Sequence, residues 1–485
     1  MDLERRVVEL EARLDAVLGD NERLRAENAA LRVENVRLRA RVDVLEARLG
    51  KNSSNSSKPP SSDDAHERAA RAKRASQRTK SGRKPGGQAG RKGTTMTRVD
   101  NPDKVIAHFP AACDGCGAGL RPADERGRRI RRQVFDVVER PVEVTEHQAV
   151  KCACVCGHVT AGAFPATAVG PPCWGPRTKA LAVLLVCRHH VPFKRAAELL
   201  GSFGAPVSVG WIVTQIASAA ALLTQWLVGL RKRLHAAPVL HADETSARVG
   251  TELWWFHVAC TTTLTFLVAN RTRGQTAVDE AGVLEHMTGT LIHDRAAMYW
   301  NYAANNHGLC VAHLCRALAG IATLPRHQDW AQQLRGVLYD AKRSCDAARQ
   351  AGDLALGPDV LADIVARYDT TLGTALGAVD HPDADNKGPH RDAANLAAAF
   401  FDYRTEILRF CHDLNIPFDN NQAERDLRMA KIVQKISYGW RTPHGVERFA
   451  AIRSYIETGR KHGHDTHDLL TQLFTTGPWQ IPHTA

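Results

Sequence analysis

The sequence lacks any apolar stretch long enough to cross a lipid bilayer. Its longest apolar runs, such as residues 180–187, fall far short of the ~20 apolar residues of a transmembrane helix. It also lacks the apolar core of a signal peptide, because the N-terminal residues are charged and helical in pattern. We therefore expect neither membrane insertion nor export, and we predict a cytoplasmic protein.

An export signal is also the context that its twelve cysteines would need to form disulfides. Without one, cysteines favour a metal site and buried thiols. A C-x-x-C pair precedes a C-x-C-x-C group by 35 intervening residues, and two such groups can supply a tetrahedral Zn²⁺ site. The predicted zinc ligands are Cys113, Cys116, Cys156 and either Cys152 or Cys154. A two-stranded ribbon over residues 129–151 would span the gap; reduced cysteines in a small β module are the alternative.

A further group, Cys310-x-x-His313 followed by Cys315, has the residue types of a second zinc site. Because Cys310 falls in an apparent strand, we interpret the thiols as buried and His313 as a strand-end residue. His313 would then be placed to touch DNA or a neighbour of a metal ligand.

Positive charge is concentrated in one block. The net charge is +12, and residues 65–98 contain 11 Lys or Arg and one acid, a local balance of +10. Such a block is typical of a polyanion-binding arm, and the polar linker at 51–64 before it has too little apolar surface to fold. Its glycine-rich part lacks the G-K-[ST] ending of a nucleotide-binding loop. The cations expected to contact DNA phosphates are Arg83, Lys84, Arg91 and Lys92.

Apolar residues recur every seven positions near the N-terminus, which predicts a coiled coil. The d positions are Leu3, Leu10, Val17, Leu24, Leu31, Leu38 and Leu45, and the a positions are Val7, Leu14, Asn21, Asn28, Asn35, Val42 and Leu49. In a parallel dimer, five of the six facing g and e pairs carry opposite charges and none is repulsive. We therefore expect a homodimer; a lone surface helix is the alternative.

Two helices joined by a glycine-containing turn are predicted at 192–201 and 207–223. This arrangement resembles a helix-turn-helix, whose second helix can enter a DNA groove. An ordinary pair of core helices is an equally good interpretation.

Three acidic residues are the candidate catalytic residues. Asp243 and Asp294 each follow a short apolar, strand-like run, and Glu424 lies near the start of a helix-like segment with Arg428 and Lys431 at i+4 and i+7. Carboxylates from two strands and a helix can hold two divalent cations about 3.5–4 Å apart over a phosphodiester, and Mg²⁺ suits such a site. The side chains of Arg428 and Lys431 lie on the same helix face as Glu424, and we expect them to contact DNA phosphates.

Other assignments exist for these residues. Each aspartate alone could be an ordinary loop residue, and Glu424 with Arg428 could be a plain i,i+4 ion pair. Asp419 and Asp426 are alternatives to Glu424 as the third carboxylate of the site. We interpret Asp419, or Asn420, as the helix cap and expect Asp426 to point away from the face of Glu424.

The order of elements predicts a mixed fold. Three apolar runs at 238–243, 253–260 and 264–269 indicate an antiparallel meander, and further strands are expected at 289–294 and 309–312. Three strands followed by alternating helix and strand is the order of a ribonuclease-H-like fold. A helical insertion at about 325–415 separates Glu424 from the two aspartates.

These features together resemble the insertion-sequence-66 family of transposases, in the same order along nearly the whole chain. The most specific matches are the linker K-N-S-S-N-S-S-K-P-P-S-S-D and the string I-P-F-D-N-N-Q-A-E-R-D-L-R; H-A-D-E-T and C-V-A-H also match. The resemblance implies a ribonuclease-H-like domain with an Asp-Asp-Glu triad, which maps onto Asp243, Asp294 and Glu424. It implies binding to terminal inverted repeats and metal-dependent cleavage and strand transfer, in DNA recombination by a mobile element.

The predicted fold class is multidomain α+β, with Mg²⁺ (or Mn²⁺) as catalytic ion and Zn²⁺ as structural ion. The expected segments are a zipper at 1–50, a basic linker at 51–105, a zinc module at 106–170, a helical DNA-binding region at 171–235, the catalytic domain at 236–460 and a tail at 461–485. DNA is the expected partner, with accessory proteins of the same element, in the nucleoid of a bacterial cytosol. The alternatives are an inactive DNA-binding relic or regulator and a structure-specific nuclease.

Overall fold

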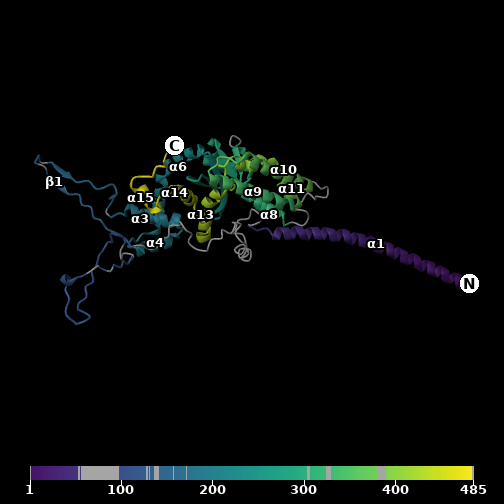
Figure 1. Ribbon diagram of the computed structural model, residues 1–485, viewed down its shortest axis with the longest axis horizontal. Helices are drawn as coiled ribbons and strands as arrows, with labels where there is room; N and C mark the ends of the chain where they lie inside the picture. The colour runs from purple at the N-terminus through teal and green to yellow at the C-terminus, as the bar shows by residue number, and fades with distance from the viewer. Residues whose placement is uncertain are drawn as a thin grey trace.

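The structure is a computed structural model that describes residues 2–52, 55, 98–126, 129, 131–135, 141–153, 155–156, 158–170, 172–302, 306–323, 329–379 and 389–482. It contains a globular body of helices around one mixed sheet. A single long helix projects from this body, with the N-terminus at its far end (Figure 1). The chain is therefore a mixed α+β protein, as predicted.

The projecting helix is α1 (Asp2–Leu49), which covers the heptad segment. The described apolar side chains at the a and d positions, which form the seam of the predicted coiled coil, are exposed to solvent in the single chain. Their exposed fractions range from 49% at Val7 to 82% at Leu49. The amides of Asn28 and Asn35 donate to the carbonyl oxygens of Leu24 and Leu31 in their own helix, at 3.1 and 3.2 Å. The helix is confirmed, and its pairing with a second copy remains a prediction.

The described residues of the cysteine-containing segment form few helices or strands. It holds the short helix η2 (Pro122–Asp124) and the hairpin of β1 (Lys151–Ala153) with β2 (Val159–Ala161). The ribbon predicted at 129–151 is wrong for the described residues, which enter a strand only at Lys151. Exposed side chains along it, such as Val134 and Val144 at 90%, have no core to pack on. Cys152 instead lies in β1, and Cys156 lies in the turn that follows it.

Five helical segments follow and form one side of the body. They are α3 (Pro176–Val183), η3 (Leu184–Arg188), α4 (Phe193–Ser202), α5 (Val209–Leu222) and α6 (Thr224–His235). The predicted helix pair is confirmed as α4 and α5, and the Ser208 hydroxyl caps α5 by accepting from the Trp211 N–H at 3.1 Å. Buried residues of these helices share one core with α14 (Pro443–Lys461) and α15 (Thr466–Thr475).

By length and apolar content, no single helix in the described ranges reaches what a membrane span requires. The pair α5 and α6, which meet at a bend of 48°, reaches it only when the two are counted together.

The sheet has the order β5-β4-β3-β6-β7. Its strands are β3 (Val239–Val249), β4 (Glu252–Cys260), β5 (Thr265–Asn270), β6 (Thr290–His293) and β7 (Asn306–Leu309). The first three are antiparallel, whereas β6 and β7 run parallel to β3. Between them lie α7 (Gln275–Ala281), η4 (Leu284–His286) and η5 (Ala297–Asn301).

Two predicted strand ends are wrong. The first strand continues beyond Asp243 to Val249, because β4 pairs with it along its whole length, from His241 opposite Cys260 to Val249 opposite Glu252. The polar residues after Asp243 hid this continuation. The last strand ends at Leu309 rather than running over 309–312, because α8 starts at Val311.

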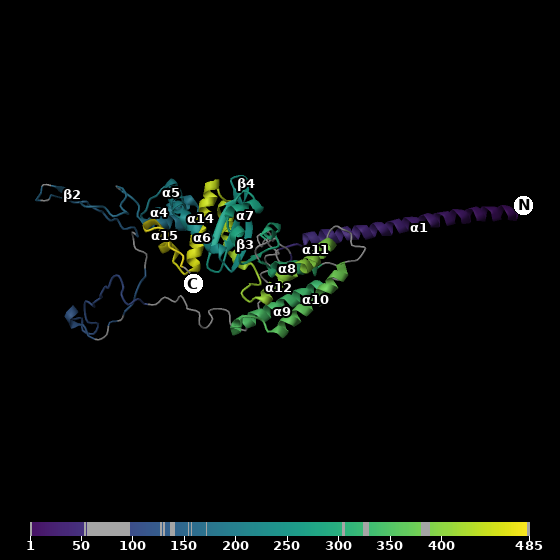
Figure 2. The same ribbon diagram turned by 90° about the horizontal axis from the view of Figure 1, so that it is seen from above.

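The helices predicted after the sheet are present. They are α8 (Val311–Ile321), α9 (Asp329–Ala351), α10 (Pro358–Val379), α11 (Pro389–Asp402) and α12 (Arg404–His412). They form a second core that includes Ile292 and Leu309 of the sheet. Figure 2 shows the sheet between these helices and the bundle of α4, α5, α6 and α15.

The last element of the site is α13 (Asn421–Ser437), which packs on β3 and β4. It shares a third core with one face of the sheet, to which it contributes Ala423 and Leu427. The chain thus returns from the helical region to the strand that carries Asp243.

Candidate active site

Asp243 lies in the middle of β3 and is half-buried. Side chains alternate across a strand, so Asp243 shares the face of Ala247 and Val249, which pack against α13. Its Oδ1 accepts the Glu244 backbone N–H at 2.9 Å. Burial, followed by the charges of Glu244, Asp294 and Glu424, raises the pKa of Asp243 well above its ordinary value. This carboxylate is therefore close enough to three other carboxylates to be affected by their charges.

Asp294 follows β6 directly, as predicted. The parallel pairing of β6 with β3, in which Ile292 lies opposite His241, brings it toward Asp243. Its Oδ1 accepts the Ala296 N–H at 3.1 Å. Burial first, and then the charge of Glu244, raises the pKa of Asp294.

Glu424 lies in the first turn of α13 and is 30% exposed. Its Oε1 is 3.5 Å from an Arg316 guanidinium nitrogen and 3.6 Å from His313 Nε2, both on α8. In the described residues it forms no ion pair with Arg428, so the plain i,i+4 interpretation is wrong. Glu424 and Asp294 both contribute to the raised pKa of Asp243. The three predicted carboxylates are therefore close enough to interact electrostatically.

Sequence reasoning gave no role in the site to Asn420, which is 1% exposed. Its Nδ2 donates to the Ala242 carbonyl at 2.8 Å, and its Oδ1 is 2.8 Å from His241 Nδ1. Its backbone N–H donates to Cys310 Sγ at 3.2 Å. Asn420 thus joins the start of α13 to β3 and to the start of α8. Its place in D-N-N before a helix indicated only a cap.

A second missed group surrounds Glu244, whose side chain is 2% exposed. It lies on the face of β3 opposite Asp243. Its Oε2 accepts the Tyr299 hydroxyl at 2.7 Å, and its Oε1 accepts from Arg273 at 2.6 and 2.8 Å. Because Tyr299 is in η5, directly after Asp294, these bonds tie the loop of Asp294 to the strand of Asp243. Sequence gave no signal for this pairing.

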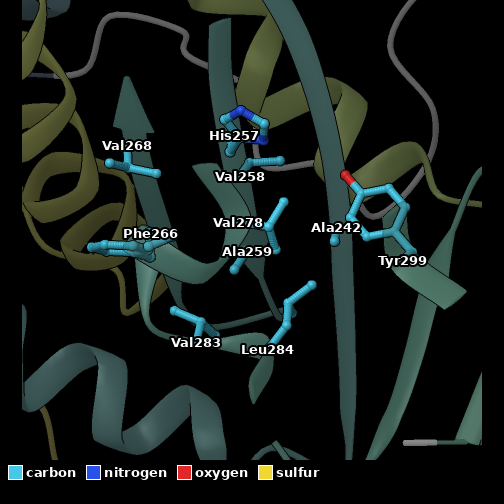
Figure 3. Close-up of a pocket in the computed structure, with 11 residues that line it drawn as sticks. Ala242, His257, Val258, Ala259, Phe266, Val268, Val278, Val283, Leu284 and Tyr299 are labelled. Atoms are coloured by element: carbon cyan, nitrogen blue, oxygen red, sulfur yellow. The ribbon is translucent and has the colours of Figure 1, made fainter. Parts of the chain in front are cut away.

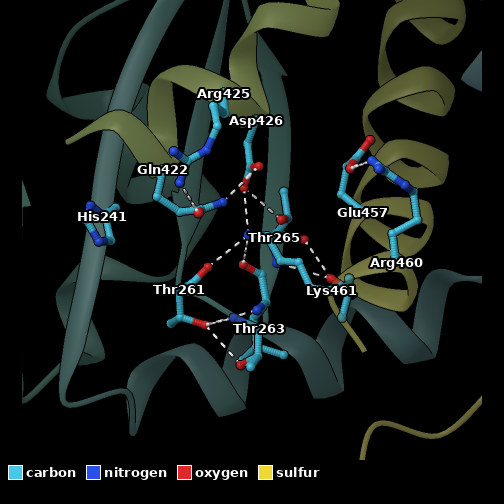
Figure 4. A network of polar contacts seen from close by, with 12 residues as sticks. His241, Thr261, Thr263, Thr265, Gln422, Arg425, Asp426, Glu457, Arg460 and Lys461 are labelled. Atoms are coloured by element: carbon cyan, nitrogen blue, oxygen red, sulfur yellow. Dashed lines mark hydrogen bonds and ion pairs between the residues drawn. The ribbon is translucent and has the colours of Figure 1, made fainter. Parts of the chain in front are cut away.

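The two alternative acids have other partners. Asp419 Oδ1 accepts the Asn421 N–H at 3.0 Å, which is a capping contact at the start of α13. Asp426 is buried and accepts from Lys461, Thr265 and Gln422 at 2.8, 2.8 and 3.1 Å (Figure 4). As predicted, Asp426 points away from Glu424.

The cations predicted to contact DNA phosphates have different surroundings in the structure. Arg428 is exposed. The Lys431 ammonium is half-buried and donates to the Ser246 carbonyl and hydroxyl at 2.8 and 2.9 Å, which fixes α13 on β3. The four cations of the basic arm, Arg83, Lys84, Arg91 and Lys92, lie outside the described residues.

Cys310 and Cys315 are buried, and burial raises the pKa of each thiol to about 12. Cys310 lies between β7 and α8, and His313 is in the first turn of α8 rather than at a strand end. Burial, followed by Arg316, lowers the pKa of His313 to about 4. His313 is therefore neutral near pH 7 and does not neutralise Glu424.

The cysteine pair at 113–116 forms a tight turn. The Gly117 N–H donates to the Cys113 carbonyl at 2.8 Å, and backbone N–H groups of Gly115 and then Cys116 lower the pKa of Cys113. This favours a thiolate, as a zinc ligand needs. Cys152 and Cys156 belong to the separate β1–β2 hairpin, and Cys154 lies outside the described residues.

Throughout the described ranges, no three or more His, Cys, Asp or Glu side chains are arranged to hold a metal ion. The chemistry of the carboxylate group nevertheless fits a divalent cation. Asp243, Asp294 and Glu424 offer the hard oxygen ligands that Mg²⁺ prefers, and their mutual repulsion is what a cation would relieve.

A small cavity lies on the opposite face of β3. It is lined mainly by apolar residues, among them Ala242, Val258, Phe266 and Leu284 (Figure 3). Two groups with polar ends, His257 and Tyr299, also line it. Tyr299 donates to Glu244, and His257 Nε2 contacts the Thr272 carbonyl oxygen at 3.1 Å. The Tyr299 hydroxyl and His257 Nε2 are therefore both hydrogen-bonded within the protein.

The raised pKa values of Asp243 and Asp294 predict that these two residues contribute less to stability as pH rises. The folded state holds the protons of Asp243 and Asp294 more tightly than the unfolded state. Their stabilising contribution is thus complete below the ordinary pKa of 3.8 and is lost as pH rises through the raised values. Magnesium would replace these protons, so we expect it to raise the Tm more at mildly alkaline than at mildly acidic pH.

Differential scanning fluorimetry with and without magnesium chloride measures this difference. Asp243→Asn is the comparison, in which the pH-dependent gain should shrink. The same gain at both pH values in the unsubstituted protein would contradict the expectation.

Two family profiles match the chain. A sequence profile described as Transposase IS66 family matches residues 172–448, more than half of the chain, including all three carboxylates. Residues 3–97 match a family of unknown function. No curated protein matches the chain.

Proposed function

The chain belongs to the IS66 family of transposases, and from this membership we propose that it binds the terminal inverted repeats of its insertion sequence, cuts the element ends and joins them to new DNA. The observation that carries the proposal is that Asp294, directly after β6, and Glu424, on α13, both raise the pKa of Asp243 on β3. Their sheet, in which three antiparallel strands precede two parallel ones, supports a ribonuclease-H-like fold.

In this proposal, Asp243, Asp294 and Glu424 hold the catalytic Mg²⁺ or Mn²⁺. When bound, such ions stabilise the charge on the attacking and leaving oxygens of an in-line displacement. Water attacks the phosphorus at the element end and a 3′-hydroxyl leaves. That hydroxyl then attacks a phosphodiester of the target DNA, whose own 3′-oxygen leaves.

The protein's own residues position these groups. Arg316 lies beside Glu424 and limits the charge that this carboxylate adds to the site. Asn420 and Lys431 fix α13 on β3, and Tyr299 with Arg273 holds Glu244 behind Asp243. Arg428 is exposed one turn beyond Glu424, and in this proposal it contacts a DNA phosphate.

We assign Zn²⁺ to the cysteine segment, where the Cys113–Cys116 turn would form half of the site. Cys156 and either Cys152 or Cys154 would have to approach it to complete the four ligands. The basic arm at 65–98 would add phosphate contacts that weaken steeply as salt rises.

The test uses purified protein, magnesium and a labelled duplex from the flanking DNA that contains the presumed element end. We expect nicked ends and then products joined to a second, unlabelled DNA, with both lost when EDTA removes the cation. Cleavage without joining would favour a structure-specific nuclease. Binding without cleavage, across several candidate ends, would favour an inactive relic.

We further propose that α1 pairs with α1 of a second copy, which would bring two element ends together. Lysine in place of Leu24 puts a charge into the d-position seam of a helix whose seam residues have no partner in the single chain. We expect this variant to be monomeric by analytical ultracentrifugation, whereas the unsubstituted protein is dimeric. The matched control is Val33→Lys, at an outward f position that is 71% exposed; monomers from both variants, or from neither, would contradict a zipper.

A further inference from the structure

Tyr438 presents an aromatic ring to solvent at the end of α13. It is 89% exposed, and none of the described residues forms a hydrogen bond with its hydroxyl. Its backbone has φ 60° and ψ 5°, the left-handed conformation. This conformation is unfavourable for a bulky residue and is usually taken by glycine or asparagine at helix ends. A tyrosine here is thus costly in backbone conformation and gains nothing from burial.

The turn that holds Tyr438 is fixed on the sheet. A Cβ at Gly439, which has φ +118°, would lie 2.2 Å from the Arg248 carbonyl oxygen. The Trp440 N–H donates to that same oxygen at 2.9 Å, and the Trp440 carbonyl accepts from Gly250 at 2.7 Å. The Trp440 ring packs against Phe256 and Phe449, with centroids 5.1 and 5.0 Å apart. Tyr438 is therefore held outward by a backbone that has little freedom.

Positively charged side chains lie along α13 between the candidate active site and the Tyr438 ring. Glu424, Arg428, Lys431 and Lys435 recur at i, i+4, i+7 and i+11 and so share one face of α13. Arg428 and Lys435 are exposed, as is Arg441 just beyond Tyr438. At ~1.5 Å per residue, Tyr438 lies about 21 Å from Glu424 along the helix.

We propose that Tyr438 stacks on an unpaired base of DNA that lies along this face of α13. The inference rests on the proposed function, because it takes the DNA to be that held at the carboxylates. Cations that follow the backbone together with an aromatic ring that receives a base are the two parts of a site for single-stranded DNA. A ring that is already held outward needs little ordering when the base binds.

The test compares binding of two labelled probes: a duplex with a single-stranded oligothymidine tail, and the same duplex with blunt ends. EDTA is present, so cleavage plays no part. Tyr438→Asn removes the ring while keeping a residue that tolerates the left-handed conformation. We expect it to bind the tailed duplex about tenfold more weakly, the order of one lost base–aromatic stack, and the blunt duplex as before.

Three further variants separate stacking from other effects. Tyr438→Phe keeps the ring and should bind like the unsubstituted protein, as should Phe401→Asn, which removes a 63% exposed ring from α11. Tyr438→Asn should leave the salt dependence of binding unchanged. Lys435→Met should reduce its slope by about one.

Equal binding of the tailed duplex by Tyr438→Asn and the unsubstituted protein, with equal Tm values, would overturn this inference and leave the proposed function intact. Equal losses on both probes would also overturn it, because the contact would not be with an unpaired base. An unsubstituted protein that binds neither probe would overturn the proposed function as well.

Discussion

Asparagine in place of Asp243 is expected to reduce DNA cleavage and strand transfer by on the order of 10³-fold or more, the scale for losing a group that acts in the transition state. The charges of Asp294 and Glu424 both act on Asp243, and a neutral amide at this position would weaken the binding of a divalent cation. DNA binding should persist, because the phosphate contacts lie elsewhere. Gel assays of nicked and joined products, beside a binding assay, measure both.

The matched control is Asp419→Asn. Asp419 lies five residues before Glu424, and its carboxylate accepts the Asn421 N–H. We expect this variant to keep most of its activity. Similar losses in both variants would show that the site depends on negative charge in general, and full activity of Asp243→Asn would remove this residue from the triad.

Methionine in place of Lys461 is expected to lower the free energy of unfolding by about 3–5 kcal/mol, the cost of leaving one partner of a buried pair without its counterion. The Lys461 ammonium is 2.8 Å from Asp426 Oδ2 and also donates to the carbonyls of Thr261 and Leu264 at 2.8 Å. The two side chains are only 12% and 7% exposed. Removal of the Lys461 ammonium therefore loosens α13 and α14 from the turn between β4 and β5 (Figure 4).

Urea unfolding followed by tryptophan fluorescence measures this loss. Lys194→Met is the matched control, since Lys194 pairs with Glu198 at 4.0 Å on an exposed helix surface, where such pairs contribute about 0–1 kcal/mol. Adding Asp426→Asn to Lys461→Met should recover part of the loss, because no charge is then left buried. A loss no larger than that of Lys194→Met would mean that water reaches Asp426.

The sequence alone determined the features whose signals are local. The heptads predicted a helix over 1–50, and α1 covers Asp2–Leu49; the predicted helix pair became α4 and α5 within two residues at each end. Repeated apolar spacing and capping residues such as Ser208 act over a few turns, so they can be read without a fold. The three carboxylates of the proposed site were predicted in the same way, from short apolar runs and the motif around Glu424.

Tertiary structure decided which of these residues meet. Glu424 contacts Arg316 on α8 rather than Arg428 one turn away, and Lys431 donates to Ser246 of β3. Asn420 joins three elements, and Glu244 binds Tyr299 across 55 positions of sequence. Such choices depend on how strands pair and helices pack. A buried polar group takes whichever partner the packing brings near, because leaving it unpaired costs more than any local preference supplies.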